Sequence, residues 1–254
     1  MWATLLASNM TVRLCISQVL RKQMSWLTLA AWAGLVGPVL FTLTWVGQEL
    51  ARIEEYSPIE ETVSALEAGP NGWIQQVNFV IFGVLSMVFA AGLYRVLRSS
   101  RPGVIGSALL FVGGVTNTVG GVAFPLREDA AGVTYDPGGH QLLGFVFFIS
   151  SAVALVLISF ALAKQAEWRR LAIPVRVAGI LMLASNPFMG ILVIPDDAPL
   201  HEWAGLAQRI IVLGLLFPAR LAIAHRLRRV ARGGRLSPEC NGAEADDDVP
   251  ARTR

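Results

Sequence analysis

Six polar side chains that could bind a ligand fall inside long apolar runs of the sequence or at the start of one: Asn117, Asn186, Gln208, Arg209, His140 and His201. Polar groups at the depth of a membrane are costly unless they face protein or water. We therefore expect these side chains to line an outward-facing polar cavity that binds or transports a small solute or a lipid. The guanidinium of Arg209 would balance an anionic or zwitterionic group of that ligand.

The two histidines also allow a different chemistry. His140 and His201, together with Asp196 and Asp197, could hold a zinc ion with an open position for water, as hydrolytic sites require. A membrane-embedded zinc hydrolase acting on lipid is therefore an alternative. The sequence has no His-Glu-x-x-His pattern and no nucleophilic Ser or Cys motif, which favours a protein that is not an enzyme and needs no cofactor. In a third interpretation the histidines lie at the membrane interface, Arg209 pairs with a loop carboxylate, and the asparagines bond across helices.

These polar residues recur in a fixed order that suggests an internal repeat. From Asn117 to Gly144 the order is Asn, Phe-Pro, two acidic residues, His and, four residues later, Gly. From Asn186 to Gly205 the order is the same, with Ile-Pro in place of Phe-Pro. Parallel repeats imply a pseudo-symmetry axis along the membrane normal, with a site where the repeats meet. The repeat would place both histidines at the external mouth and the asparagines deeper.

The composition indicates which solvent surrounds these residues. Of the 254 residues, 54% are hydrophobic and only 15% are charged, whereas about a quarter of a soluble domain is charged. Six apolar runs each have roughly the 20 residues that a helix needs to cross the hydrocarbon core. The runs are 27–47, 74–94, 103–124, 141–163, 173–194 and 203–224. The sequence therefore predicts an all-α polytopic membrane bundle of six transmembrane helices.

Basic residues are distributed unevenly between the runs. One set of intervening segments contains fourteen Lys and Arg residues, and the other contains only Arg52 and Arg127. Loops rich in Lys and Arg stay in the cytoplasm, so both termini of this multi-pass cell-membrane protein are predicted to be cytoplasmic. The same bias accounts for the net charge of +3 without nucleic acid as a partner.

Two terminal segments flank the predicted membrane domain at residues 27–226. Residues 1–26 are interpreted as a cytoplasmic extension without a cleaved signal peptide, and Met24 is an alternative start. Residues 227–254 are interpreted as a basic and then acidic disordered tail. Arginines near this boundary are expected to contact anionic lipid headgroups: Arg226, Arg228, Arg229, Arg232 and Arg235.

Small residues form a stripe along the third run. Glycines recur at seven-residue spacing, each followed by another small residue: Gly106-Ser107, Gly113-Gly114 and Gly120-Gly121. Seven residues is nearly two helical turns, so the stripe lies on one face and lets a neighbouring helix approach closely.

The first external loop has its own local pattern. Residues 56–66 read Tyr-Ser-Pro-Ile-Glu-Glu-Thr-Val-Ser-Ala-Leu. Pro58 favours the start of a short helix. Ile59, Val63 and Leu66 recur at three to four residues, so this helix is expected to lie flat on the membrane surface. A lid over the external mouth is the functional alternative.

Several short motifs of this chain occur together in one family: Gly-Pro-Asn-Gly-Trp at residues 69–73, Asn78-Phe79, Gly83, Phe124-Pro125 and His140. With the six runs and the loop at residues 56–66, they resemble a bacterial membrane-protein family catalogued only as a domain of unknown function, number nine-nine-eight. The resemblance covers about residues 30–226. It implies a six-span fold and no mechanism.

Overall fold

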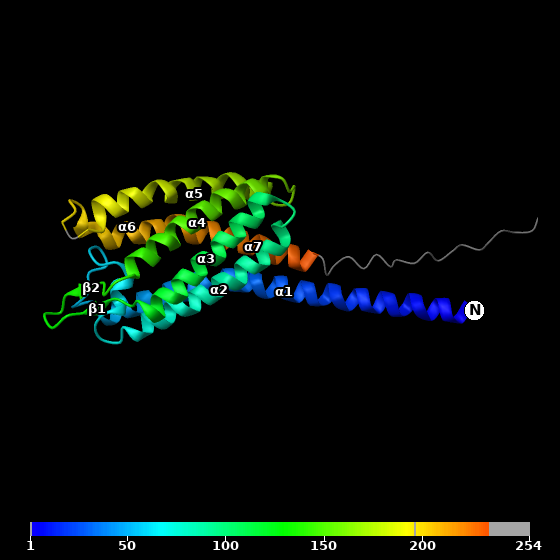
Figure 1. The fold of residues 1–254 in the computed structure, drawn as a ribbon, viewed down its shortest axis with the longest axis horizontal. Helices are drawn as coiled ribbons and strands as arrows, with labels where there is room; N and C mark the ends of the chain where they lie inside the picture. Colours follow the sequence, from blue (N-terminus) through cyan, green and yellow to red (C-terminus); the bar gives the residue numbers. More distant parts are fainter. Residues whose placement is uncertain (1, 196, 234–254) are drawn as a thin grey trace, which may run out of the picture.

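Six helices that are long and apolar enough to cross a membrane form the body of the described structure (Figure 1). The computed structural model describes residues 2–195 and 197–233, with side chains described from residue 25 onward. The spans are Ser25–Ala51, Trp73–Leu97, Arg101–Ala123, His140–Ala163, Arg169–Val193 and His201–Arg232. They contain the six predicted runs to within a residue at either end, so the prediction of a six-span all-α bundle is confirmed.

Five long α-helices follow one another along the chain: α1 (Trp2–Ala51), α2 (Trp73–Leu97), α3 (Arg101–Ala123), α4 (His140–Ala163) and α5 (Arg169–Phe188). The predicted extension at residues 1–26 continues directly into the first span, because α1 begins at Trp2 and its first half extends beyond the bundle (Figure 1). The predicted tail lies outside the described residues from position 234 onward.

The fifth and sixth spans each contain one turn of π-helix. The turn η2 (Met189–Val193) follows α5, and η4 (Val212–Leu216) separates α6 (Ala204–Ile211) from α7 (Phe217–Gly233). π-turns inside α-helices are rare and occur frequently at functional sites. Their presence in two neighbouring spans directs attention to the region between them.

Short elements connect the spans at one end of the bundle. The 3-10 helix η1 (Val63–Glu67) lies in the first loop, and η3 (His201–Trp203) precedes α6. Between α3 and α4, β1 (Arg127–Glu128) pairs antiparallel with β2 (Thr134–Tyr135).

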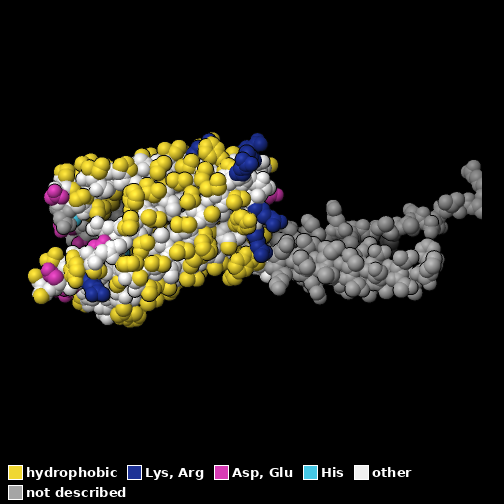
Figure 2. Space-filling model, in the orientation of Figure 1, with side chains coloured by type: hydrophobic (Ala, Val, Ile, Leu, Met, Phe, Trp, Pro, Cys, Tyr) yellow, Lys and Arg dark blue, Asp and Glu magenta, His cyan; other side chains and the backbone are white. Residues whose placement is uncertain are grey.

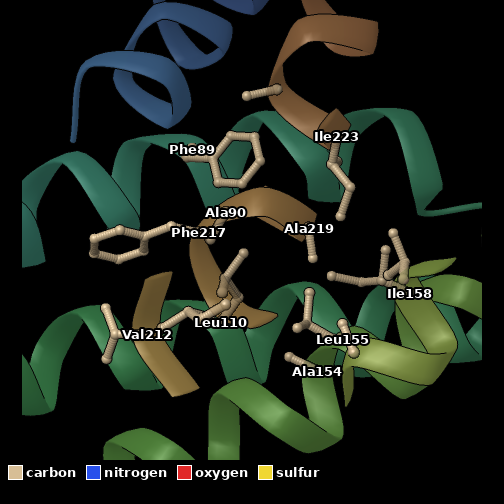
Figure 3. Close-up of a cluster of buried hydrophobic side chains, with 14 of the residues drawn as sticks. Phe89, Ala90, Leu110, Ala154, Leu155, Ile158, Val212, Phe217, Ala219 and Ile223 are labelled. Carbon is tan, nitrogen blue, oxygen red and sulfur yellow. The ribbon is translucent and has the colours of Figure 1, made fainter. Parts of the chain in front are cut away.

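The helices pack as a closed ring around one apolar core. Each of α1 to α5 packs against the next, and the sixth span contacts both α5 and α1. Side chains from α2, α3, α4, η4 and α7 meet in the core (Figure 3): Phe89, Ala90, Leu110, Leu155, Ile158, Val212, Phe217 and Ile223. Because lipid tails are as apolar as these side chains, close packing rather than the hydrophobic effect favours this association.

The predicted small-residue stripe is confirmed as a packing surface, and it serves two neighbours. A Cβ added at Gly114 would lie 2.8 Å from the carbonyl oxygen of Gly83 on α2, and one added at Gly106 would lie 3.1 Å from the carbonyl oxygen of Ala154 on α4. The first glycine of each pair therefore faces α4, and Gly114 and Gly121 face α2, so that both neighbouring helices approach the backbone of α3.

Replacing Gly114 by alanine is expected to lower the free energy of unfolding by about 1–3 kcal/mol, because the added methyl group meets backbone that cannot move aside. The matched control is Gly214→Ala, where an added Cβ meets nothing within 4 Å. Thermal unfolding of the two purified variants measures the difference. Equal melting temperatures would contradict the close approach of α2 and α3.

The two ends of the bundle carry opposite charges (Figure 2). Lys and Arg side chains gather at the end formed by the α2–α3 and α4–α5 connections and the last turns of α7, which we name the basic end. Asp and Glu side chains gather at the end formed by the other three connections, which we name the acidic end. The predicted orientation depends on this polarity, and the cytoplasmic placement of the basic end stays a prediction.

Candidate functional site

A cavity of about 950 Å³ lies inside the bundle toward the acidic end. All six spans contribute to its wall, together with the first loop and the β1–β2 hairpin. Figure 2 shows a hollow at this end, open on the flank of the bundle. Five of the six side chains singled out from the sequence line the cavity: Asn117, Asn186, His140, His201 and Gln208. The sixth, Arg209, is not part of the lining.

The deep part of the cavity is aromatic. Phe82 is the centre of this floor, with ring centroids 4.8 Å from Phe41, 5.5 Å from Phe217 and 6.3 Å from Phe147. All four rings line the cavity, and they come from four different spans. The cavity is therefore polar at its mouth and apolar at its base.

Arg209 on α6 attaches the first loop to the bundle instead of facing the cavity. Its Nε lies 3.1 Å from a carboxylate oxygen of Glu49 on α1, and its Nη2 contacts the same oxygen. Nη1 donates to the backbone carbonyl of Glu61 at 2.9 Å, and Nη2 donates to the hydroxyl of Tyr56 at 2.7 Å. One planar guanidinium thus connects α6, α1 and the loop, as its fixed fork of donors allows.

Tyr56 extends this junction inside the loop. Its hydroxyl lies 2.8 Å from the backbone carbonyl of Thr62 and 3.1 Å from that of Glu61. Burial raises the pKa of Tyr56 well above its ordinary value, although Arg209 opposes this shift. The phenol therefore stays protonated, donating to a loop carbonyl while it accepts from the guanidinium.

Further hydrogen bonds join the loop to α6. The backbone N–H of Val63 donates to Oε1 of Gln208 at 2.7 Å. The N–H groups at the start of α6 also donate to the loop, from Gly205 to Glu60 at 3.1 Å and from Leu206 to Ile59 at 2.9 Å. A helix start has free N–H groups that need partners, and the loop supplies carbonyl oxygens for two of them.

The expectation that the loop lies flat on the membrane surface is wrong. The helix begins at Val63 and not at Pro58, and every residue of η1 is buried. Val63 and Leu66 are 3% and 0% exposed. Val63 and Leu66 pack against the spans beneath, whereas Ile59 is 49% exposed. Residues from Glu60 to Ala65 form the roof of the cavity.

Arg209→Ala is expected to release this roof. The variant leaves Glu49 without its counter-charge. Both side chains keep about a tenth of their exposure (11% and 12%), so we expect the free energy that holds the loop on the bundle to fall by about 3 kcal/mol, at the low end for a buried pair. Hydrogen exchange at residues 56–67 should become about a hundredfold faster. Arg209→Lys should restore little of the protection from hydrogen exchange, since an ammonium lacks the planar fork of donors.

The control for this experiment is Arg170→Ala, which removes an exposed arginine at the basic end. It should leave hydrogen exchange in the loop unchanged. Unchanged exchange in Arg209→Ala itself would show that the backbone hydrogen bonds to α6 suffice to hold the roof.

A buried carboxylate supports His140 at the mouth of the cavity. The side chain of Glu67 is fully buried, and its Oε2 lies 3.1 Å from Nδ1 of His140 and accepts the N–H of Leu126 at 3.1 Å. Nδ1 is also 3.0 Å from the carbonyl oxygen of Phe124. Two acceptors at Nδ1 require a proton there, which leaves Nε2 as the ring nitrogen free to act in the cavity.

Asp136 fixes the start of the helix that carries His140. Its carboxylate accepts the N–H groups of Gly138 at 2.8 Å, His140 at 3.3 Å and Gln141 at 2.9 Å. Burial alone would raise the pKa of Asp136, but these backbone donors outweigh it and hold the pKa below its ordinary value. The carboxylate is therefore ionised and stabilises the first turn of α4.

The two asparagines take different positions in the wall. Asn186 donates to the carbonyl of Met182, one turn earlier in its own helix, at 2.7 Å. Asn117 lies 3.5 Å from the carbonyl oxygen of Phe79 on α2. Both asparagines and both histidines of the predicted repeat line the cavity. The two glycines of the repeat differ, because Gly144 borders open space whereas Gly205 touches the loop backbone.

The predicted zinc ligands are only partly described. His201 lines the cavity, and its Nδ1 is buried with no hydrogen bond to any described residue. Asp197 is exposed, and Asp196 lies outside the described residues. Within residues 2–195 and 197–233, no three His, Cys, Asp or Glu side chains gather closely enough to hold a metal. A zinc site that uses Asp196 stays a prediction.

Arg220 on α7 is an interior charge that was not among the expected site residues. It is 3% exposed, and its guanidinium lies 4.8 Å and 5.1 Å from the ring centroids of Phe82 and Phe89. Its Nε and Nη2 have no hydrogen-bond partner among the described residues. Arg220 therefore packs against Phe82, at the aromatic floor of the cavity.

The arginines expected to contact headgroups lie at the basic end where they are described. Arg226 is 4.0 Å from Glu167, and Arg228 lies 4.3 Å from the ring centroid of Trp32. Arg229 and Arg232 are exposed, whereas Arg235 lies outside the described residues. Their contact with anionic headgroups stays a prediction.

Six apolar spans around a cavity open at one end define an α-helical, multi-pass membrane protein. The chain belongs to the family described as a protein of unknown function (DUF998), whose model matches residues 35–225. The match confirms the family resemblance noted from the first-loop motifs. Neither the curated proteins nor the solved structures compared with the chain gave a match.

Proposed function

We propose that the chain binds a lipid or a lipid-like amphiphile in the cavity at the acidic end. The observation that carries this proposal is the division of the lining into a polar mouth and an aromatic floor. An amphiphile matches both parts, since its head can hydrogen-bond near His140, His201 and Gln208 while its chain packs on the phenylalanine rings. A cavity of about 950 Å³ is at the upper end of the size of ordinary ligand pockets.

The route of entry supports a ligand that comes from the bilayer. The loop from Glu60 to Ala65 covers the cavity and is attached to α6 by several hydrogen bonds. On the flank, η2 packs against α6 and η3 rather than against α4, so the two spans diverge there. Gly144 and Gly190 line the cavity from the two sides of this divergence, with no atoms near their Cβ positions. The ligand enters between α4 and η2 from the surrounding leaflet.

The charge of the lining selects among headgroups. The acidic residues Glu60, Glu61 and Asp136 border the cavity, and no Lys or Arg is found among its described lining residues. Arg209, expected from the sequence to balance an anion, is engaged by Glu49. A zwitterionic, cationic or neutral head therefore suits the mouth better than an anionic one. With the positive-inside bias, the ligand belongs to the leaflet on the side away from the cytoplasm.

Filling the cavity tests this function. Gly144→Trp and Gly190→Trp add a ring where there is open space, so both variants should fold and both should weaken binding of a fluorescent lysophosphatidylcholine at least about tenfold, the effect of losing roughly 1.4 kcal/mol of contacts. Gly47→Trp is the matched control, because Gly47 on α1 also borders open space but lies outside the cavity. Equal binding by all three variants would rule out the cavity as the ligand site.

A second candidate, hydrolysis of the bound lipid, is favoured by the Glu67–His140 pair. A buried carboxylate that holds Nδ1 and leaves Nε2 free is the arrangement of a general base or of a metal-ligating histidine. Wild-type protein should then release product from the bound lipid, and His140→Ala should not, although it still binds lipid. Elemental analysis of the wild type, His140→Ala and His201→Ala separates a zinc-dependent reaction from a metal-free one. If the reaction needs zinc, the wild type contains stoichiometric zinc and both variants lose it.

A further inference from the structure

A second recess lies at the opposite end of the bundle, on the flank formed by α1, α2 and α3. It has a volume of about 840 Å³ and differs in lining from the acidic-end cavity. Arg95 and Arg98 of α2 border it, and no Asp or Glu is present among the described residues that line it. Ala91, Ala108, Phe111 and Val112 supply an apolar wall. We name this recess the basic groove.

Two polar groups in the basic groove have no partner within the described part of the chain. Ser107 is 2% exposed, and its hydroxyl makes no hydrogen bond there, although serines in helices ordinarily bond a carbonyl of the preceding turn. The indole N–H of Trp26 is also buried and unpaired. Leaving such groups without partners is costly, so a ligand that accepts hydrogen bonds would satisfy both.

The depth of these groups matches the parts of a phospholipid. Ser107 lies six residues beyond Arg101, the start of α3, which is about 9 Å along the helix axis. The arginines lie nearer the membrane surface, since Arg98 directly follows α2. The groove therefore offers positive charge at phosphate depth with the Trp26 N–H beside it, the Ser107 hydroxyl at ester depth and an apolar wall beyond them.

We propose that the basic groove binds one anionic phospholipid from the leaflet at the basic end. Its phosphate lies between Arg95 and Arg98 beside the Trp26 N–H, its ester oxygens face Ser107, and an acyl chain follows the wall made by Ala108 and its neighbours. The guanidinium of Arg95 is 5.8 Å from the Trp26 ring centroid, which keeps the arginine at the edge of the groove. The proposal is independent of the ligand in the acidic-end cavity.

Native mass spectrometry of the full chain with added phosphatidylglycerol or phosphatidylcholine tests this site. Arg95→Gln/Arg98→Gln should lower the affinity for phosphatidylglycerol roughly thirtyfold and leave the weaker binding of phosphatidylcholine almost unchanged. The matched control is Arg229→Gln/Arg232→Gln, which removes two exposed arginines of α7 at the same end. Equal losses in both double variants would mean diffuse attraction to basic charge and would overturn the proposal.

A second pair of variants tests whether lipid binding depends on the shape of the groove as well as on its positive charge. Ala108→Trp fills the groove without altering any charge and should lower phosphatidylglycerol binding to a similar extent, whereas Ala184→Trp, at an exposed position of α5 outside both recesses, should have no effect. Wild-type affinity in Ala108→Trp would overturn the proposal even if the arginine variants bind weakly. Gly144→Trp, which blocks the acidic-end cavity, should leave phosphatidylglycerol binding intact.

Discussion

The hydrocarbon core of a membrane offers no hydrogen-bond partner, and this constraint determines where the polar side chains of the structure lie. Between α1 and α2 several of them bond to one another: Gln48 and Asn78 both donate to Oε1 of Gln75 at 3.1 Å, and Asn78 also donates to the carbonyl of Phe41 at 3.0 Å. The Nε2 group of Gln75 has no hydrogen-bond partner among the described residues. Other polar side chains line the acidic-end cavity, where several of them bond to helix backbone or to the first loop. The constraint that organises the bundle thus also produces its polar interior.

The first loop turns that polar interior into a defined site. Loops at a membrane surface are ordinarily mobile, but here Arg209 is bonded to Glu49 and Tyr56 at once, and Glu67 reaches across to the start of α4. Both ends of the roof are therefore attached to different spans. The attached loop thus forms a roof over the cavity. The same contacts determine the free nitrogen of His140.

Periodicity and composition predicted the spans, because a helix must be long and apolar to cross a bilayer whatever its partners are. The side chains Asn117, Asn186, His140, His201 and Gln208 could also be found, since polarity at membrane depth is visible in a sequence. The residues that these side chains contact could not be predicted from the sequence. Glu67 is one of many acidic residues in its loop, and nothing local indicates that it alone is buried against a residue more than seventy positions away. For Arg209, one interpretation of the sequence predicted a loop carboxylate as the partner, but which carboxylate it is depends on how α1 and α6 meet.

Arg220 in α7, whose Nε and Nη2 have no hydrogen-bond partner among the described residues, has a consequence for biogenesis. A charged residue near the centre of a span opposes partitioning into lipid by about 2.5–3.5 kcal/mol, and contact with two aromatic rings offsets only part of that. Insertion of the last span is therefore more favourable beside α2, because Phe82 and Phe89 contact the guanidinium there. We therefore expect insertion of the last span to depend on α2 being in the membrane first.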